Sequence, residues 1–329
     1  MQSSVSTSEE LTKHYTTAID ALCEIASACC ALGRVGDARH LLGTSLQLIE
    51  ASEVEPRDRL KLLLLYAKIL IVNQLVTLRD ADLLFSTIVQ AKQIAEAAHN
   101  QQGIADALSL LGQAHYFATV FSSSTLDSPQ GKYEEALAYQ QQALSLREAL
   151  HDTRGVSESH FFIGNVYERW QQNDLAQQHY TKAERIAEQY GHLYERTEPA
   201  RHLAGLALHR GNLDQALTYA LQALSLREEA RFQPFLPLDH LLLSSVYLAK
   251  GDTVNALLHT EIASAIASEM GNKGALVLSL LNLGDIQVAQ KEEAQARASY
   301  EQALVLAQEL QFAYAIARAS ESLERHTKR

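Results

Sequence analysis

Small and apolar residues recur along the chain with a period of 40 residues. The positions that mark the period are all alanines: Ala136, Ala176, Ala216, Ala256 and Ala296. A second alanine follows each of them seven positions later, at Ala143, Ala183, Ala223, Ala263 and Ala303. Around the markers, apolar residues keep the i, i+3, i+4, i+7 spacing of one helix face, as in Leu213, Ala216, Leu217, Ala220 and Leu224. The pattern therefore predicts a regular array of amphipathic helices.

A second landmark precedes each marker and predicts a turn between two helices. It is an apolar residue followed by a small one, at Ile163-Gly164, Leu203-Ala204, Leu243-Ser244 and Leu283-Gly284. Further on comes Gln171, Gly211, Gly251 or Lys291. A glycine at this place can adopt the positive φ that ends a helix. Each repeating unit is therefore predicted to be a helical hairpin.

These residues resemble the signature of the tetratricopeptide repeat. One unit carries it as Ile163, Gly164, Tyr167, Ala176, Tyr180 and Ala183, and another as Leu283, Gly284, Ala296, Tyr300 and Ala303. The units are longer than the usual repeat of about 34 residues, and the closing proline is generally absent. Longer units are similar to those of bacterial ligand-sensing and peptide-sensing regulators. The resemblance implies an all-α fold, an α-solenoid whose hairpins stack into a right-handed superhelix.

Extending the register predicts about seven hairpins. We expect a disordered N-terminus over residues 1–8, a repeat array over 9–311, and a capping helix with a basic tail over 312–329. Leu111-Gly112 lies farther from Ala136 than the register allows, which predicts an insertion loop over about 119–130. The loop is either tolerated growth or a functional element. The five prolines are expected in linkers, in the insertion or in first helical turns, because a proline inside a helix costs about 3 kcal/mol.

The resemblance places the first helix of each hairpin on the concave wall, and it implies a protein or peptide segment as the partner bound there. The third to fifth units put aromatic and polar side chains on that wall. The candidate groove residues are Asn73, Gln113, Tyr116, Phe117, Phe161, Asn165, Glu168, Arg169, Arg201 and His209. Four of these are of the types found in the clamp that binds chaperone tails, but the full Lys/Asn pattern of that clamp is missing.

The last two hairpins have an apolar wall instead. Its residues are Leu238, Leu241, Leu248, Leu278, Leu281 and Val288. Such a wall can receive the apolar face of an amphipathic helix. The alternative is that the closing helix, which carries Phe312, Ile316 and Leu323, folds over it. The sequence leaves both possibilities open.

The amino-acid composition disfavours some classes of binding partner. Acidic residues outnumber basic ones by 39 to 28, and the formal charge of −11 disfavours general binding to nucleic acid or to anionic membranes. The three cysteines lie within eight positions and offer no disulfide framework, which indicates a reducing compartment. The most apolar run, residues 62–76, is short and contains Lys68. We therefore expect a cytoplasmic protein with no membrane partner, and a homodimer remains an open alternative.

No catalytic or cofactor motif occurs in the sequence. His202 and His209 lie seven positions apart, near Glu198, but unliganded imidazoles are the expected state, so no metal and no cofactor are predicted. The sequence therefore favours a non-enzymatic scaffold that binds a protein or peptide segment in a regulatory or assembly role. One alternative is a sensor of a small molecule or signalling peptide that changes superhelix conformation. A weaker alternative is a phosphatase-like activity in the groove.

Overall fold

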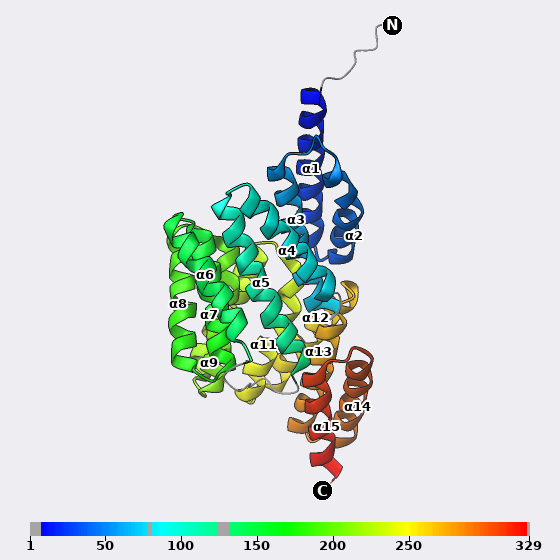
Figure 1. Cartoon of the computed structure of the whole chain (residues 1–329). Helices are drawn as coiled ribbons and strands as arrows, with labels where there is room; N and C mark the ends of the chain where they lie inside the picture. Colours follow the sequence, from blue (N-terminus) through cyan, green and yellow to red (C-terminus); the bar gives the residue numbers. More distant parts are fainter. Residues whose placement is uncertain (1–7, 78–80, 124–131, 328–329) are drawn as a thin grey trace.

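A computed structural model describes residues 8–77, 81–123 and 132–327, and within them the chain folds into consecutive antiparallel helices (Figure 1). The helices are α1 Ser8–Ala31, α2 Val35–Ser45, α3 Pro56–Thr77, α4 Ala81–Ala97, α5 Gln101–Ser122, α6 Glu134–Ala149, α7 Thr153–Arg169, α8 Asn173–Gln189, α9 Leu193–His209, α10 Leu213–Glu229, α11 Leu236–Ala249, α12 Thr253–Glu269, α13 Lys273–Ala289, α14 Glu293–Glu309 and α15 Ala313–Thr327. Two short 3-10 helices, η1 Leu46–Glu50 and η2 Gln233–Phe235, join them.

The helices pack as seven hairpins, α1–α2 to α13–α14, with α15 closing the array. The predicted all-α solenoid of about seven hairpins is therefore confirmed. The expected insertion loop and the expected disordered N-terminus can each be compared with the structure only over their described residues. Helix α5 continues to Ser122, so the first residues of the expected insertion are helical, and residues 124–130 lie outside the described residues. Ser8 already belongs to α1, and the rest of the expected disordered N-terminus also lies outside them.

The repeat period consists of two nearly equal halves. From α7 to α10, and from α12 to α14, each helix has 17 residues. Residues with positive φ close successive helices at every half period, at His151, Gln171, Gly191, Gly211, Arg231, Gly251, Gly271, Lys291 and Gln311. The N–H of Asn212 donates to the carbonyl of Ala207, five residues earlier, at 2.9 Å. This hydrogen bond is typical of a helix that ends at a residue in the left-handed conformation, here Gly211. The glycine turns predicted at Gly211 and Gly251 are confirmed.

Small residues let the two helices of a hairpin approach closely. The marker alanines Ala176, Ala216, Ala256 and Ala296 are fully buried. At Gly164 a Cβ atom would lie 2.6 Å from the ring of Tyr180, so no larger residue fits there without movement. The period in the sequence is thus the period of the helix crossings.

The first helices of the hairpins form the inner wall of the coil. Successive first helices contact one another: α3 with α5, α5 with α7, α7 with α9, α9 with α11 and α11 with α13. Among the described residues, no successive pair of second helices packs comparably. Curvature brings together the elements on the inside of a bend, so the first helices lie on the concave side.

The coil also closes on itself. Helix α3 contacts α13, α1 contacts η2, and α5 contacts α15, although these elements lie far apart in the sequence. A Cβ atom on Gly33 would lie 3.0 Å from the side chain of Met270, and one on Gly274 would lie 3.7 Å from the carbonyl oxygen of Leu75. Phe232 packs against the core of the first hairpins. The first and last parts of the array are therefore neighbours.

This closure explains the apolar character of α3. In the described part of the chain, α3 is the one helix long and apolar enough to span a membrane, with a mean hydropathy of 1.6 over its most apolar window. Of that window, 67% is buried inside the structure. A helix that is apolar all round is expected where neighbours cover it on several sides, and α3 contacts α1, α4, α5 and α13.

The apolar wall of the last hairpin is covered by the chain itself. Leu278, Leu281 and Val288 of α13 belong to one apolar cluster with Phe312, Ile316 and Leu323 at the end of the chain. For α13 the structure therefore shows the second alternative, the closing helix packed against the wall, whereas Leu238, Leu241 and Leu248 of α11 do not belong to this cluster.

One expectation was wrong. Pro199 does not lie in a linker or a first turn, because it is the seventh residue of α9 and is buried there. The fixed φ of proline is compatible with a helix. Because Pro199 has no N–H, one hydrogen bond of α9 is missing, and the helix continues without it. Pro56 begins α3 and Pro237 is the second residue of α11, as expected.

Two histidine pairs fasten alternate hairpins. In the fourth hairpin, the Nδ1 atoms of His160 and His179 are 3.1 Å apart, and in the sixth those of His240 and His259 are 2.9 Å apart. Such a contact needs at least one neutral imidazole, because two imidazolium ions have only donors to offer. Burial, and then the neighbouring histidine, lower the pKa of His160 and of His240 to about 4. Burial and then Lys182 lower the pKa of His179 to about 4, and burial lowers the pKa of His259.

We expect the protein to lose stability as pH falls from about 6.5 toward 4. A histidine whose pKa is lowered by folding binds its proton more readily when unfolded, so the free energy of unfolding rises with pH across this window. Between pH 7 and pH 5, each pair should change the free energy of unfolding by about 1 kcal/mol. This value is smaller than two fully buried histidines would give, because solvent screens the partly exposed member of each pair. Urea unfolding of the wild type and of His240→Gln/His259→Gln at both pH values measures the effect. An equal pH dependence of the two proteins would contradict this role.

Replacing Ala216 by arginine should destabilise the fold by several kcal/mol. Ala216 is fully buried and packs with Ala207 and Val246, so the change forces volume and charge into a helix crossing. Leu221→Arg on the same helix is the control, because Leu221 is exposed and its replacement should leave the melting temperature nearly unchanged. Equal melting temperatures for the two variants would refute the assigned crossing.

Candidate functional site

A connected set of polar side chains lies on the inner wall where α7 and α9 meet. The hydroxyl of Tyr180 donates to Glu168 at 2.5 Å, and its oxygen lies 2.8 Å from the side-chain oxygen of Asn165. His202 Nδ1 lies 2.8 Å from the same carboxylate and 3.1 Å from the Tyr180 oxygen. Asn165 and Glu168 lie one turn apart on α7, His202 comes from the neighbouring first helix, and Tyr180 reaches in from α8. Three helices thus meet at one carboxylate.

The set continues along α9 toward α11. His202 Nε2 lies 2.9 Å from the guanidinium of Arg201, which donates to Glu198 at 2.7 Å. Glu198 also accepts from Arg227, and Arg227 donates to Asp239 at 2.8 Å. Arg227 and Asp239 are fully buried, whereas the side chain of Glu168 is 34% exposed and that of Arg201 is 23% exposed. The buried end anchors the row, and the partly exposed end meets solvent.

A second arginine makes an equivalent junction two hairpins earlier. Arg147 is buried and donates to Asp106 of α5 at 3.0 Å and to Glu158 of α7 at 2.8 Å. Arg147 and Arg227 lie two periods apart, each at the end of the same segment Ala-Leu-Ser-Leu-Arg, at 143–147 and at 223–227. Each binds the first helix of its own hairpin and the first helix of the next. Neither arginine is among the predicted site residues, although this repetition in the sequence is a signal that marks both.

Burial and pairing shift these groups in opposite directions. Burial alone raises the pKa of Glu168, but His202 and the Tyr180 hydroxyl stabilise the carboxylate and bring its pKa down to about 2. Burial opposes ionisation of Glu198 as well, but Arg201 and Arg227 together hold its pKa well below the usual range. Burial, followed by the nearby Glu168, raises the pKa of Tyr180. Both carboxylates are therefore ionised at neutral pH, and Tyr180 keeps its proton.

An aromatic group adjoins the row at its α5 end. Arg169 Nε donates to the hydroxyl of Tyr116 at 2.9 Å, and its guanidinium lies 5.7 Å from the centre of the same ring. Phe117 stands edge-on to Tyr116, with ring centres 5.2 Å apart. This part of the wall therefore offers apolar surface next to the polar row.

The structure brings most of the predicted groove residues together. Seven belong to the polar row or to the rings beside it: Tyr116, Phe117, Phe161, Asn165, Glu168, Arg169 and Arg201. The other three lie apart from the row. Asn73 is buried on α3 and donates to Thr77, Gln113 is buried and donates to Ser109 beside the Arg147 cluster, and His209 is exposed at the end of α9. Burial also withdraws Asn165 and Tyr116 from direct contact with a ligand.

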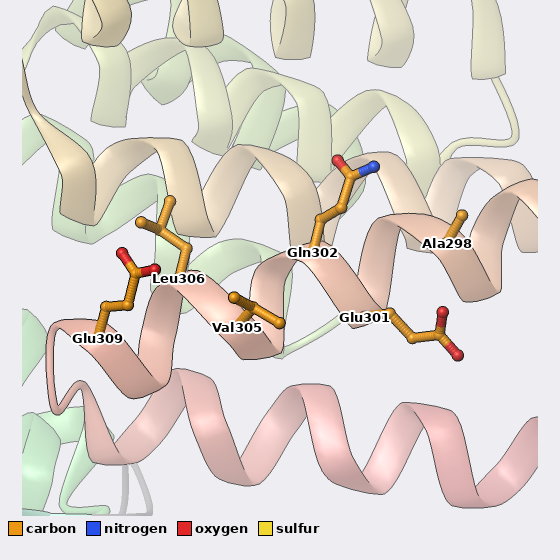
Figure 2. Close-up of a pocket in the computed structure, with 6 residues that line it drawn as sticks. All are labelled: Ala298, Glu301, Gln302, Val305, Leu306 and Glu309. Carbon is orange, nitrogen blue, oxygen red and sulfur yellow. The ribbon is translucent and has the colours of Figure 1, made fainter.

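Two other candidates carry no site. Among the described residues, no group of three or more His, Cys, Asp or Glu side chains could hold a metal, and His202 contacts Glu168. A surface depression is lined by Ala298, Glu301, Gln302, Val305, Leu306 and Glu309 (Figure 2). All six residues belong to the single helix α14, a second helix away from the inner wall.

Family models identify the repeats. The model described as tetratricopeptide repeat matches residues 126–189, and a second model of the same description matches residues 278–309. The protein carries tetratricopeptide repeats. The matched segments contain the units that carry the signature, around Gly164 and around Gly284. No curated protein sequence matches the chain.

Solved structures share the fold of this repeat protein. A Rap protein complexed with competence and sporulation factor superposes with a TM-score of 0.66 at 14% identity, covering 95% of this chain and 86% of that one. The apo form of RapI gives 0.52 at 15% identity, covering 89% and 77%. Aspartyl phosphate phosphatase F from Bacillus subtilis gives 0.52 at 14% identity, covering 100% and 96%. At these identities the likeness shows the fold alone.

Removing the buried Arg227 should destabilise the protein strongly. In Arg227→Met, Asp239 loses its partner in a fully buried site, which should cost about 3–5 kcal/mol. The double variant Arg227→Met/Asp239→Leu removes both charges and should recover much of that loss. Arg210→Met is the control, since its pair with the exposed Asp174 is worth about 0–1 kcal/mol. Denaturant unfolding measures all three, and equal losses for Arg227→Met and Arg210→Met would contradict the anchoring role.

Proposed function

We propose that this tetratricopeptide-repeat protein binds a peptide or protein segment against the inner wall formed by α5, α7 and α9. The observation that carries the proposal is the polar row from Glu168 to Arg201, whose members hold one another in place and still keep part of their surface exposed. Ordered groups of this kind bind at a low entropic cost, because their rotamers are already fixed. The adjoining Phe117 supplies apolar area. The role is that of a scaffold rather than a catalyst.

Sensing of a peptide is the second candidate, and one observation favours it. The first and last parts of the array are in contact, through α3 with α13 and through α1 with η2. The inner wall lies in the helices between these contacts, so a ligand on the wall can affect the distance between the two ends. The similar Rap structure was solved with a factor bound. A ligand that prefers one spacing of the ends would shift the population toward that spacing. A phosphatase-like activity has less support, because Glu168 is ionised and already bonded to His202 and to the Tyr180 hydroxyl, which keeps its proton.

A peptide library tests the proposal without a known partner. Selection of random peptides against the full chain should yield binders, and Glu168→Gln/Arg201→Gln should weaken them about tenfold, because charge-assisted hydrogen bonds to the wall are lost. Arg210→Gln is the control and should bind as the wild type does, because Arg210 pairs with Asp174 of α8 and not with the polar row. Circular dichroism checks that each variant is folded. Binders with equal affinity for the wild type and the groove variant would contradict a site on this wall.

The same binders separate scaffold from sensor. A peptide that binds the native state raises the melting temperature in either case. Only a sensor also changes the spacing between the ends of the coil, which distance measurements between spin labels on α2 and α14 would report. An unchanged distance at saturation leaves the scaffold as the function.

A further inference from the structure

Gly205 lies inside α9, on the helix face that forms the inner wall. It comes one turn after Arg201 and His202 of the polar row, and it is partly exposed. A glycine inside a helix is less favourable than an alanine there, because it loses more backbone entropy on folding. A glycine inside a helix is therefore expected where a neighbour comes too close for a side chain.

No part of the fold comes that close to Gly205. At Gly112, Gly164 and Gly284, an added Cβ atom would lie within 3.0 Å of a side chain on the second helix of the same hairpin. At Gly205 it would meet no atom within 4 Å. Among the glycines that the structure describes, Gly205 is the only one beyond the first turn of a helix with such open space. Packing within the chain does not explain this glycine.

The register position of Gly205 carries a polar side chain in the hairpins before and after it. The equivalent residues are Asn165, Ser245 and Asp285. The Tyr180 oxygen lies 2.8 Å from Asn165, and Tyr300 donates to Asp285 at 2.7 Å. In the fifth hairpin Ala220 takes the position of these tyrosines. The inner wall thus lacks both side chains there, and the backbone of α9 is accessible at Gly205.

We infer that the main chain of the bound segment crosses α9 at Gly205. The inference rests on the proposed function, since it concerns the same inner wall. A glycine lets another backbone approach closely, because no Cβ atom stands between the two chains. The partly exposed guanidinium of Arg201, one turn away, offers donors to the carbonyl groups of the segment beside the crossing.

The wall changes from polar to apolar at this crossing. The register position of Glu168 in α7 is held by Leu208 in α9 and by Leu248 in α11. Both leucines are partly exposed. A segment that crosses at Gly205 along the coil therefore meets charged groups on the α7 side and apolar surface on the α11 side. The segment that fits is polar on one side of the crossing and carries an apolar residue on the other.

Substitutions at Gly205 separate binding from folding. The probes are peptides selected from the random library against the wild-type chain. Gly205→Ala should raise the melting temperature by about 1–2 °C, because alanine enters open space in a helix. It should weaken the selected peptides about tenfold, because a methyl group enters a close contact, and Gly205→Leu should weaken them about a hundredfold or more. Gly36→Leu, at an exposed glycine of the second helix α2, is the control and should bind as the wild type does.

The outcomes distinguish this inference from the proposed function. Equal affinity for Gly205→Leu and the wild type overturns the crossing, whereas the site on the wall stands if Glu168→Gln/Arg201→Gln weakens the same peptides. A lower melting temperature for Gly205→Ala also overturns it, since packing would then require the glycine. If truncation of one peptide side chain restores binding to Gly205→Leu, a side chain and not the main chain occupies the space. A library without binders overturns both proposals.

The apolar side of the crossing has a test of its own. Leu248→Gln should weaken the selected peptides about fivefold, because apolar contact area is lost. Val254→Gln, at a valine 75% exposed on the second helix α12, is the control and should leave the affinity unchanged. Equal affinities for the Leu248→Gln variant and the wild type would show that the segment does not continue toward α11.

Discussion

The close approach of two helices at a small residue is the constraint on which the rest of the structure depends. A buried alanine or glycine at each crossing leaves room for a single arrangement, in which the ring of Tyr180 lies against Gly164 and that of Tyr300 against Gly284. Since a single hairpin cannot bury its own apolar face, each crossing is also the platform on which the next hairpin stacks. The crossing angle, repeated from hairpin to hairpin, sets the curvature, and the curvature decides which helices line the inner wall and which distant helices meet.

Two kinds of buried polar interaction alternate along the array: arginine–carboxylate junctions and histidine pairs. The third and fifth hairpins end in Arg147 and Arg227, which bind carboxylates on two successive first helices. The fourth and sixth hairpins carry the histidine pairs. In these two hairpins Ala187 and Ala267 occupy the position of the arginines, so the packing at the junction is apolar there. From the third to the sixth hairpin the polar repeat is therefore twice as long as the structural repeat, and the seventh hairpin departs from it, with Ala307 at the position of the arginines.

The sequence could predict the hairpins because their signals are local. Helix faces, turns and crossings depend on residues within one unit, and so the marker alanines and Gly211 were placed correctly. The closure of the coil could not be predicted in this way, since the contact of α3 with α13 follows from curvature accumulated over many units. Asn73 and Gln113 have the right residue types and helix faces for a groove, but both are buried and their amides donate to residues of their own helices. The position of Pro199 inside α9 could not be predicted either, because a helix packed between its neighbours tolerates one missing hydrogen bond.

The pairing of charges along the inner wall limits what the wall can recognise. Glu168 contacts His202 and Tyr180, and Arg201 contacts Glu198 and His202, so each of these charged groups already has hydrogen-bond partners on the wall. A ligand with one isolated charge would have to break such a pair, and the group left behind would keep much of its desolvation cost. A ligand that offers uncharged donors and acceptors, as a peptide backbone does, can use the exposed edges of the same groups without breaking them. Apolar side chains can add contact area beside Phe117. At the proposed site, this arrangement therefore favours a segment of polypeptide over a small ion, because the charged groups already have hydrogen-bond partners.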